Sequence, residues 1–259
     1  MTANLSSASM PEPRSVTCLG LRFHVLTLDE AAGDIMAATD GPFKYIVTPN
    51  VQHMVAILED ESRLKPLYVS AWRVLCDSRV LRRLALFRGI RLEVVVGADL
   101  SEQLLTRAAR NGVPVAIVGP SQTDCAKLAA LFPGLLWTCH TPVQGFIKSE
   151  LDVARAVAFV VKTAAPLVFL AVGMPQQEQL AYRLQHEPKA HGIGLCIGAS
   201  IDFLTGKQVR APVWMQHAGL EWLHRLAFNP VRLWRRYLIE CPKIFYFMYR
   251  EGRNARLSR

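Results

Sequence analysis

Several polar side chains that could do chemistry directly follow short apolar runs of this chain. Asp77 comes after one such run, and Thr48 and Asn50 end another. A carboxylate can act as a general base in a group transfer, and a hydroxyl or an amide can hydrogen-bond a ligand. Each of the three could instead cap the helix that follows it, so the residues alone leave both roles open.

Glycine turns follow three further apolar runs. Gly97 is followed by Asp99, Gly119 stands alone, and Gly173-Met174-Pro175-Gln176-Gln177-Glu178 combines a glycine turn with a helix-initiating proline. A glycine allows close approach of the backbone, and a strand, a turn and a helix start point N–H groups at phosphate or ribose. The alternative role of Asp99 is helix capping. The alternative role of Glu178, in the first turn of the expected helix, is a favourable interaction with the helix dipole.

The C-terminal part of the chain concentrates positive charge. Residues 210–259 contain ten Lys/Arg and three Asp/Glu, so they carry +7 of the total formal charge of +9. Such a segment needs an anionic partner, and nucleic acid, an acidic membrane leaflet and a diphosphate all qualify on charge. Guanidinium groups bind diphosphates bidentately. The candidates are Arg210, Arg225, Arg232, Arg235 and Arg236.

Alternating apolar runs and helical patterns predict the elements that position these side chains. The expected strands are Tyr45 to Thr48, Val74 to Cys76, Leu92 to Val96, Val115 to Val118, Leu167 to Val172 and Ile193 to Ile197. The expected helices lie near residues 51–60, 79–87, 100–110, 121–131, 150–164 and 176–186. This pattern predicts an α/β fold, a Rossmann-like, mostly parallel sheet with helices on both faces. Ligands of such sheets bind beyond the carboxyl ends of the strands, where the candidate residues fall.

Three parts of the chain are expected. Residues 1–15 read as a flexible leader, residues 16–211 as the Rossmann-like α/β catalytic domain, and residues 212–259 as a basic helical appendage. In the appendage, amphipathic helices at about 216–227 and 230–239 are separated by Asn229-Pro230. Aromatic residues interleaved with cations at Ile244 to Tyr249 suit a membrane surface, with a helix packed on the core as the alternative. No apolar run reaches the roughly 18 to 20 residues that cross a bilayer, so the expected membrane contact is peripheral.

Other classes of site lack their signatures. Half of the residues are hydrophobic and a fifth are charged, which excludes a disordered chain. The six cysteines form no CxxC pair, so we expect buried reduced thiols rather than zinc ligands or a disulfide framework. The histidines show no metal-ligand spacing and no Asp-x-Asp motif occurs, so no metal and no cofactor are predicted. Ser200 lacks the Gly-x-Ser-x-Gly context of a serine hydrolase.

Four ordered motifs carry a resemblance to a known family. They are Gly173 to Glu178, Gly198 to Phe203, Arg210 to Trp214 and Gly219 to Leu226. In this order, and before a basic C-terminus, they resemble the WecG/TagA/CpsF family of bacterial glycosyltransferases over about residues 20–240. The resemblance implies transfer of a hexose-type sugar, with inversion, from a UDP-sugar to a polyprenyl-diphosphate-linked sugar in surface-polysaccharide synthesis. It also implies a peripheral place on the cytoplasmic face of the membrane, and a donor that is UDP-N-acetylmannosamine, its uronic acid or UDP-glucose.

The same resemblance implies roles for individual residues. Asp77 corresponds to the proposed general base, although the glycine that usually follows it is Ser78 here. An arginine is frequent in the family at the place of Val94, and either Arg91 substitutes for it or a phosphate contact is lost. Because no metal motif is present, the arginines are expected to offset the charge of the UDP leaving group. The expected substrate-binding residues are Thr48, Asn50, Gly97, Asp99, Gly119, Gln177, Arg210, Arg225, Arg232 and Arg236.

Two other functions fit parts of the pattern. A nucleotide-dependent oxidoreductase shares the strand-turn-helix units, but it predicts a GxGxxG after the first strand and an acidic residue about 20 positions later, and neither is present. A nucleic-acid-binding protein could use the basic appendage, and its affinity would depend strongly on salt. We expect no nucleic-acid partner and leave the oligomeric state open, a homo-oligomer included.

Overall fold

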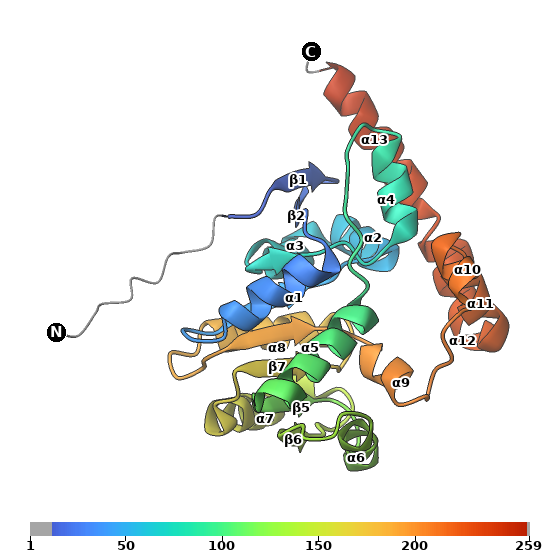
Figure 1. Cartoon of the computed structure of the whole chain (residues 1–259). Coiled ribbons are helices and arrows are strands. Elements are labelled where there is room, and N and C mark those ends of the chain that lie inside the picture. The colour runs from blue at the N-terminus through green and yellow to red at the C-terminus, as the bar shows by residue number, and fades with distance from the viewer. Residues whose placement is uncertain (1–11, 258–259) are drawn as a thin grey trace.

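A parallel sheet runs through the centre of the structure, a computed structural model that describes residues 12–257. Its strands are β3 (Lys44–Val47), β4 (Arg73–Val74), β5 (Val115–Val118), β6 (Trp137–His140), β7 (Leu167–Leu170) and β8 (Ile193–Cys196). They lie in the order β4-β3-β8-β7-β5-β6, and every neighbouring pair is parallel (Figure 1). The predicted Rossmann-like α/β fold is confirmed.

Helices cover both faces of the sheet because successive strand side chains point to opposite sides. Tyr45 and Val47 pack into one apolar cluster, and Ile46 between them packs into the other. The first cluster is completed by α2 (Val51–Glu59), α3 (Glu61–Val69), α4 (Arg79–Leu86), α7 (Glu150–Thr163), α8 (Gln176–Gln185) and the 3₁₀ turn η1 (Phe146–Lys148). The second is completed by α1 (Leu28–Ala37), α5 (Gly97–Asn111), α6 (Gln122–Leu131) and α9 (Ser200–Leu204).

Some elements were not predicted from the sequence. An antiparallel hairpin of β1 (Ser15–Cys18) and β2 (Leu21–His24) precedes the sheet, although Ser15 falls within the expected leader; residues 1–11 lie outside the described part of the chain. β6 reads Trp-Thr-Cys-His and lacks an apolar run because it lies at the edge of the sheet. In α3, Pro66 interrupts the helical pattern.

The strand predicted over Leu92 to Val96 is wrong. This segment makes a single bridge, between Val94 and Cys76, and then enters α5. The Val95 N–H donates one hydrogen bond of 2.9 Å to the Cys76 carbonyl. The adjoining strand β4 has only two residues, so it offers too short an edge for a further strand to pair along.

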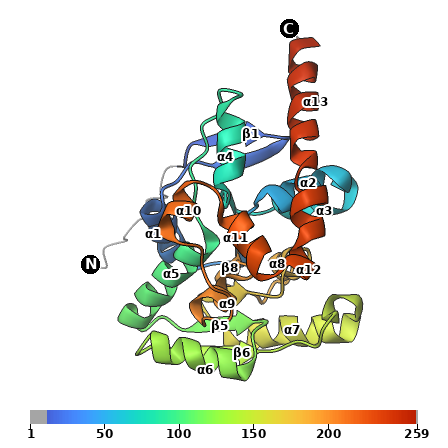
Figure 2. The same cartoon turned by 90° about the vertical axis from the view of Figure 1, so that its right-hand side faces the viewer.

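The C-terminal arm, which we define as residues 212–257, is helical throughout most of its length. It contains α10 (Val213–His217), α11 (Glu221–Phe228), α12 (Pro230–Arg235), a π-helical turn η2 (Arg236–Glu240) and α13 (Lys243–Leu257). The break at Asn229-Pro230 is confirmed. α13 packs beside α2 through Ile244 and Met248, which belong to the core (Figures 1 and 2). No helix within residues 12–257 combines the length and the apolar character that crossing a bilayer needs.

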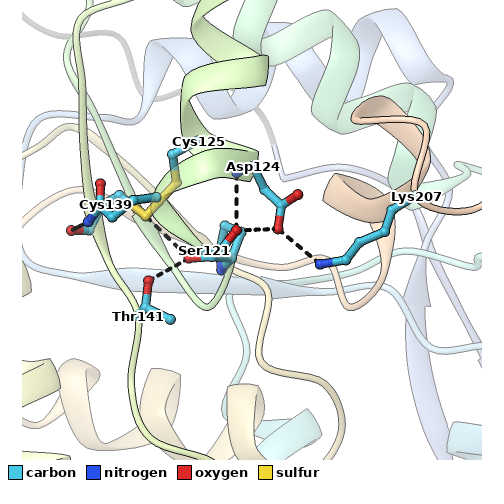
Figure 3. Close-up of a disulfide and its surroundings, with 8 residues drawn as sticks. Ser121, Asp124, Cys125, Cys139, Thr141 and Lys207 are labelled. Atoms are coloured by element: carbon cyan, nitrogen blue, oxygen red, sulfur yellow. Dashed lines mark hydrogen bonds and ion pairs between the residues drawn. A yellow bond between two sulfur atoms is a disulfide. The ribbon is translucent and has the colours of Figure 1, made fainter.

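The expectation that all cysteines are reduced is wrong for one pair. Cys125 of α6 and Cys139 of β6 form a disulfide, and Cys18, Cys76, Cys196 and Cys241 are free (Figure 3). The helix and the strand that follows it pack together, which brings residues 14 apart in sequence to a Cα–Cα distance of 6.7 Å. Beside the disulfide, Lys207 pairs with Asp124 at 2.9 Å and ties the segment after α9 to α6 (Figure 3).

Candidate functional site

A large cavity lies where the carboxyl ends of the strands meet the C-terminal arm. Its volume is about 880 Å³, which is within the range of sites for nucleotide-sized ligands. Of the predicted site residues, eight line it: Thr48, Asn50, Asp77, Gln177, Arg210, Arg225, Arg232 and Arg236. The fold therefore brings residues that follow three strands, β3, β4 and β7, to one place together with Arg210 and three arginines of the arm.

Asp77 lines this cavity, three residues after the end of β4. It is not the helix cap, because Ser78 caps α4 with its hydroxyl, which accepts a hydrogen bond of 3.1 Å from the Leu81 N–H. Desolvation by the surrounding protein raises the pKa of Asp77 to about 7, and the Glu221 carboxylate adds to this rise. Arg225 and the Gly97 amide act in the opposite direction. A carboxyl with a pKa near neutrality is suited to accept a proton.

Gly97 supports this arrangement without lining the cavity. A Cβ atom built at this position would lie 3.2 Å from the Ser200 Oγ, 3.3 Å from the Thr48 Oγ1 and 3.6 Å from the Asp77 Oδ2. The absence of a side chain therefore lets Thr48, Asp77 and Ser200 converge around the start of α5. The predicted contact of Gly97 with substrate stays a prediction, whereas its packing role follows from these distances.

Thr48 and Asn50 are held by hydrogen bonds at the end of β3. The Thr48 hydroxyl donates to the Cys196 carbonyl at 3.3 Å. The Asn50 Oδ1 caps α2 by accepting from the N–H groups of Gln52, at 3.0 Å, and His53, at 3.4 Å. Capping is thus one role of Asn50, and its Nδ2 group makes no hydrogen bond within residues 12–257, which leaves it available to a ligand in the cavity.

Gln177 and Glu178 form a buried pair in the first turn of α8. The Gln177 Oε1 accepts from the Gly198 N–H at 2.9 Å, and its Nε2 donates to the Glu178 Oε1 at 2.8 Å. Gln177 thereby ties α8 to the loop after β8. Burial raises the pKa of Glu178 to about 7, and its Oε2 lies buried without a hydrogen-bond partner in the described residues.

The arm contributes arginines whose donors are not fully used. The Nε atoms of Arg225 and Arg236 are buried and have no hydrogen-bond partner among the described residues. The Arg225 Nε lies 3.9 Å from Glu221, too far for a hydrogen bond, and its guanidinium stacks on the Phe203 ring at 4.6 Å. Both residues also line the cavity, so the terminal nitrogens of their guanidinium groups are the atoms that could bind an anionic ligand there.

Other predicted residues lie elsewhere. Asp99 does not line the cavity and instead pairs with Arg210 at 2.5 Å. Gly119 also lies outside the cavity lining, and a Cβ there would come within 2.5 Å of the Ala171 carbonyl oxygen. Arg91 is exposed and lines no described cavity. Within residues 12–257, no three His, Cys, Asp or Glu side chains gather as ligands of a metal ion would.

Sequence reasoning missed His53, which lines the cavity beside Asn50. Its Nδ1 accepts a hydrogen bond of 3.2 Å from the Asn50 N–H. Burial and the nearby Arg236 lower the pKa of His53 to about 3, so the ring is neutral at physiological pH. His53 could have been found from its position three residues after Asn50, the N-cap residue of α2, because a side chain at that position can hydrogen-bond to the backbone N–H of the N-cap residue.

Two comparisons with known proteins agree with the resemblance seen in the motifs. A family model described as "Glycosyl transferase WecG/TagA/CpsF family" matches residues 16–258, which include the arm. An N-acetylglucosaminyldiphosphoundecaprenol N-acetyl-beta-D-mannosaminyltransferase of Bacillus subtilis (strain 168) is 29% identical over 167 residues. That match covers 62% of this chain and 62% of the relative, so the chain spans less than two thirds of the relative's length.

Proposed function

The chain belongs to the glycosyl transferase WecG/TagA/CpsF family, and on that premise we propose that it moves a hexose-type sugar from a UDP-sugar to a polyprenyl-diphosphate-linked sugar. The transfer proceeds with inversion and without a metal ion. One observation carries the proposal: Asp77, with a pKa of about 7, shares a cavity with the partly unsatisfied guanidinium groups of Arg225 and Arg236.

In the proposed reaction, Asp77 removes the proton of the acceptor hydroxyl. The acceptor oxygen forms a bond to the anomeric carbon from the face opposite the diphosphate, and the bond from that carbon to the diphosphate oxygen breaks. The electron pair leaves with UDP. A base whose pKa lies near the working pH is ionised often enough to act and still basic enough to take the proton.

Arg225 and Arg236 stabilise the departing diphosphate. Guanidinium groups offer paired N–H donors to phosphate oxygens, and their positive charge is worth most where water is excluded. The position of both residues in the cavity lining supports this role, as does the presence of Arg232 in the same lining. Asn50 and Gln177 line the cavity near the proposed sugar-nucleotide position.

The acceptor is carried by a lipid, so the enzyme is proposed to work at the cytoplasmic face of the membrane as a peripheral protein. On α13, Phe245, Tyr246 and Tyr249 are exposed by 58% or more, beside Arg250. Rings at the boundary between water and lipid, next to cations that meet lipid phosphates, support this contact. The name of the B. subtilis relative, whose acceptor is a diphosphoundecaprenol, supports an acceptor of the same class.

The donor is proposed to be UDP-N-acetylmannosamine, its uronic acid or UDP-glucose. The mannosaminyl group in the relative's name favours testing the first of these before the others. The identity of 29% covers only part of both chains, so the shape of the cavity rather than this similarity decides the choice.

Incubation of the purified full chain with each of the three donors and an N-acetylglucosaminyl-diphosphate lipid tests the proposal. UDP release that depends on the acceptor, together with a lipid product heavier by one sugar, is the expected result. The same reaction without the acceptor lipid serves as the background control. No release above this background with any donor would refute the activity. Loss of UDP release when a chelator is added, and its recovery when Mg²⁺ is supplied in excess, would refute metal independence.

A further inference from the structure

A second, smaller cavity lies between α4 and the end of α10. Its volume is about 480 Å³. Arginines dominate its lining, which consists of Arg79, Arg82, Arg83, Leu86, Glu93, Val94 and His217. No role for this cavity follows from the residues assigned to donor binding or proton transfer above.

The second cavity adjoins the first. Arg79 and Val94 line both, and Arg79 follows Asp77 by two residues. A ligand whose reacting hydroxyl lies at Asp77 would enter the second cavity by passing Arg79, which stands at the boundary of the two. Arg79 also brings a guanidinium group close to Val94, which stands where an arginine is frequent in the family.

The charge of this cavity is strongly positive. Arg79 and Arg82 form no ion pair within residues 12–257, and Glu93 is the single carboxylate in the lining. Arg83 is already engaged, because its guanidinium donates to the carbonyls of His217 and Ala218 and so holds the arm against α4. Two free guanidinium groups on one wall suit a diphosphate, which has oxygens enough for both.

The far end of the cavity is apolar. Leu86 lines it and is 55% exposed, and Phe87 beyond it is 88% exposed. Arg88, in the turn after α4, donates a hydrogen bond of 2.8 Å to the Met248 carbonyl of α13, so its side chain links this turn to the helix that exposes aromatic rings. The two helices are seen in Figures 1 and 2. Cations followed by an apolar tip match a ligand in which a diphosphate precedes a hydrocarbon chain.

We propose that this second cavity binds the diphosphate of the lipid-linked acceptor and that the polyprenyl chain leaves past Leu86 and Phe87. The inference rests on the proposed function and adds to it a separate place for the acceptor. The diphosphate of UDP has the same chemistry, so the test must separate the two sources. In this arrangement the donor diphosphate lies with Arg225 and Arg236, and the acceptor diphosphate lies with Arg79 and Arg82.

Binding of farnesyl diphosphate, inorganic pyrophosphate and UDP to the full chain tests this inference. We expect Arg82→Gln to weaken farnesyl diphosphate binding about tenfold while UDP affinity stays within twofold, because Arg82 lines only the second cavity. Leu86→Ser should weaken farnesyl diphosphate but not pyrophosphate, since it removes apolar contact alone. Arg91→Gln, which changes an exposed arginine outside both cavities, is the matched control and should change neither affinity.

Three results would overturn the inference. They are unchanged farnesyl diphosphate binding in Arg82→Gln, an equal loss of UDP binding in that variant, and no binding of farnesyl diphosphate to the wild-type chain. Thermal unfolding of each variant checks that the fold is kept. Because these measurements need no turnover, a chain that binds farnesyl diphosphate as expected but transfers no sugar would refute the proposed function and leave this site standing.

Discussion

Arg210 and Asp99, which are 111 residues apart in sequence, form a partly buried ion pair in the structure. The pair joins the segment that leaves α9 to the first turn of α5, where a carboxylate also favours the helix N-terminus. Both residues were expected to bind substrate. Their mutual pairing indicates that they fix the point from which the arm crosses the strand ends, and it brings the arm to the cavity that contains Asp77.

Asp77→Asn should reduce kcat by roughly 100-fold to 10,000-fold, because an amide cannot accept the proton of the acceptor hydroxyl. Affinity for the UDP-sugar should stay within threefold. In the wild-type enzyme, kcat/KM should rise as pH increases through about 7, since Asp77 must be ionised to act. Initial rates over pH 5.5 to 9 measure both effects. Asp40→Asn, on the exposed surface, is the control, and a rate independent of pH across this window would remove Asp77 as the base.

If Arg236 and Arg232 bind the leaving diphosphate as proposed, Arg236→Gln and Arg232→Gln should each lower kcat/KM by roughly tenfold to a hundredfold, since each would remove a charged hydrogen bond of about 1.5 to 3 kcal/mol. Arg235→Gln is a closely matched control, because Arg235 is 75% exposed, pairs with Glu240 and does not line the cavity. Steady-state kinetics with varied donor measure the difference. Equal losses of kcat/KM in Arg235→Gln and Arg236→Gln would show that the overall positive charge of the arm matters, and not a contact of Arg236 in the cavity.

Glu178 should make stability depend on pH. Burial raises its pKa from the ordinary 4.5 to about 7, so between these values the unfolded chain ionises while the folded chain stays protonated. Stability therefore falls as pH rises from about 4.5 to about 7, by roughly 3 kcal/mol for a shift of this size. Glu178→Gln keeps an acceptor for Gln177 and should remove the part of this dependence that Glu178 causes, while Asp77, whose pKa is also raised to about 7, should still contribute its own part. Urea unfolding at several pH values measures it, with exposed Glu102→Gln as control; parallel curves for Glu178→Gln and wild type would contradict the prediction.

Gly119→Ala should destabilise the fold far more than Gly41→Ala. Both glycines have φ of +131°, but a Cβ at Gly119 would lie 2.5 Å from the Ala171 carbonyl oxygen, whereas nothing lies within 4 Å at Gly41. The backbone strain is thus shared, and the difference isolates the steric clash, which we expect to be about 2 kcal/mol or more. Denaturant unfolding gives both values. Similar losses would mean that the ends of β5 and β7 separate easily.

Exposed rings of the arm should govern binding to anionic lipid. Replacing Phe245 and Tyr249 by Ser removes apolar area that can enter a bilayer interface, so vesicle binding should weaken about tenfold. Co-sedimentation with vesicles containing phosphatidylglycerol, compared with phosphatidylcholine alone, measures this. Leu151→Ser is the control, since Leu151 is 63% exposed on α7, outside the arm. Equal binding of all three proteins would contradict a membrane role for α13.

Local sequence patterns determined most of the sheet and its covering helices. The runs at Val115 to Val118 and Ile193 to Ile197 could be assigned because a strand buried on both faces needs apolar side chains in succession. The placing of Thr48, Asp77 and Gln177 at one edge followed from the parallel order, since carboxyl ends of parallel strands meet there. The break at Asn229-Pro230 was also local, because proline cannot continue the preceding helix.

Edge and hairpin elements could not be assigned in this way. β6 carries polar residues because one of its sides has no neighbouring strand, and β1 and β2 are held by packing and by their turn rather than by an apolar run. The residues 92–96 have the composition of a strand, yet their neighbour β4 is too short to pair with them. The strand propensity of a segment is therefore overridden when it has no neighbouring strand to pair with, and a segment of low strand propensity becomes a strand when such a neighbour is present.

The amino-acid sequence by itself therefore determined the class of fold, the residue types at the strand ends and the excess of positive charge in the last fifty residues. Only the tertiary structure decided how the charges are used. Arg210 is taken by Asp99, Arg225 and Arg236 keep free donors, and Arg79 with Arg82 forms a second cationic cavity. The physical reason is range: backbone patterns depend on neighbours a few residues away, whereas ion pairs, desolvation and cavities depend on groups that the fold brings together from distant parts of the chain.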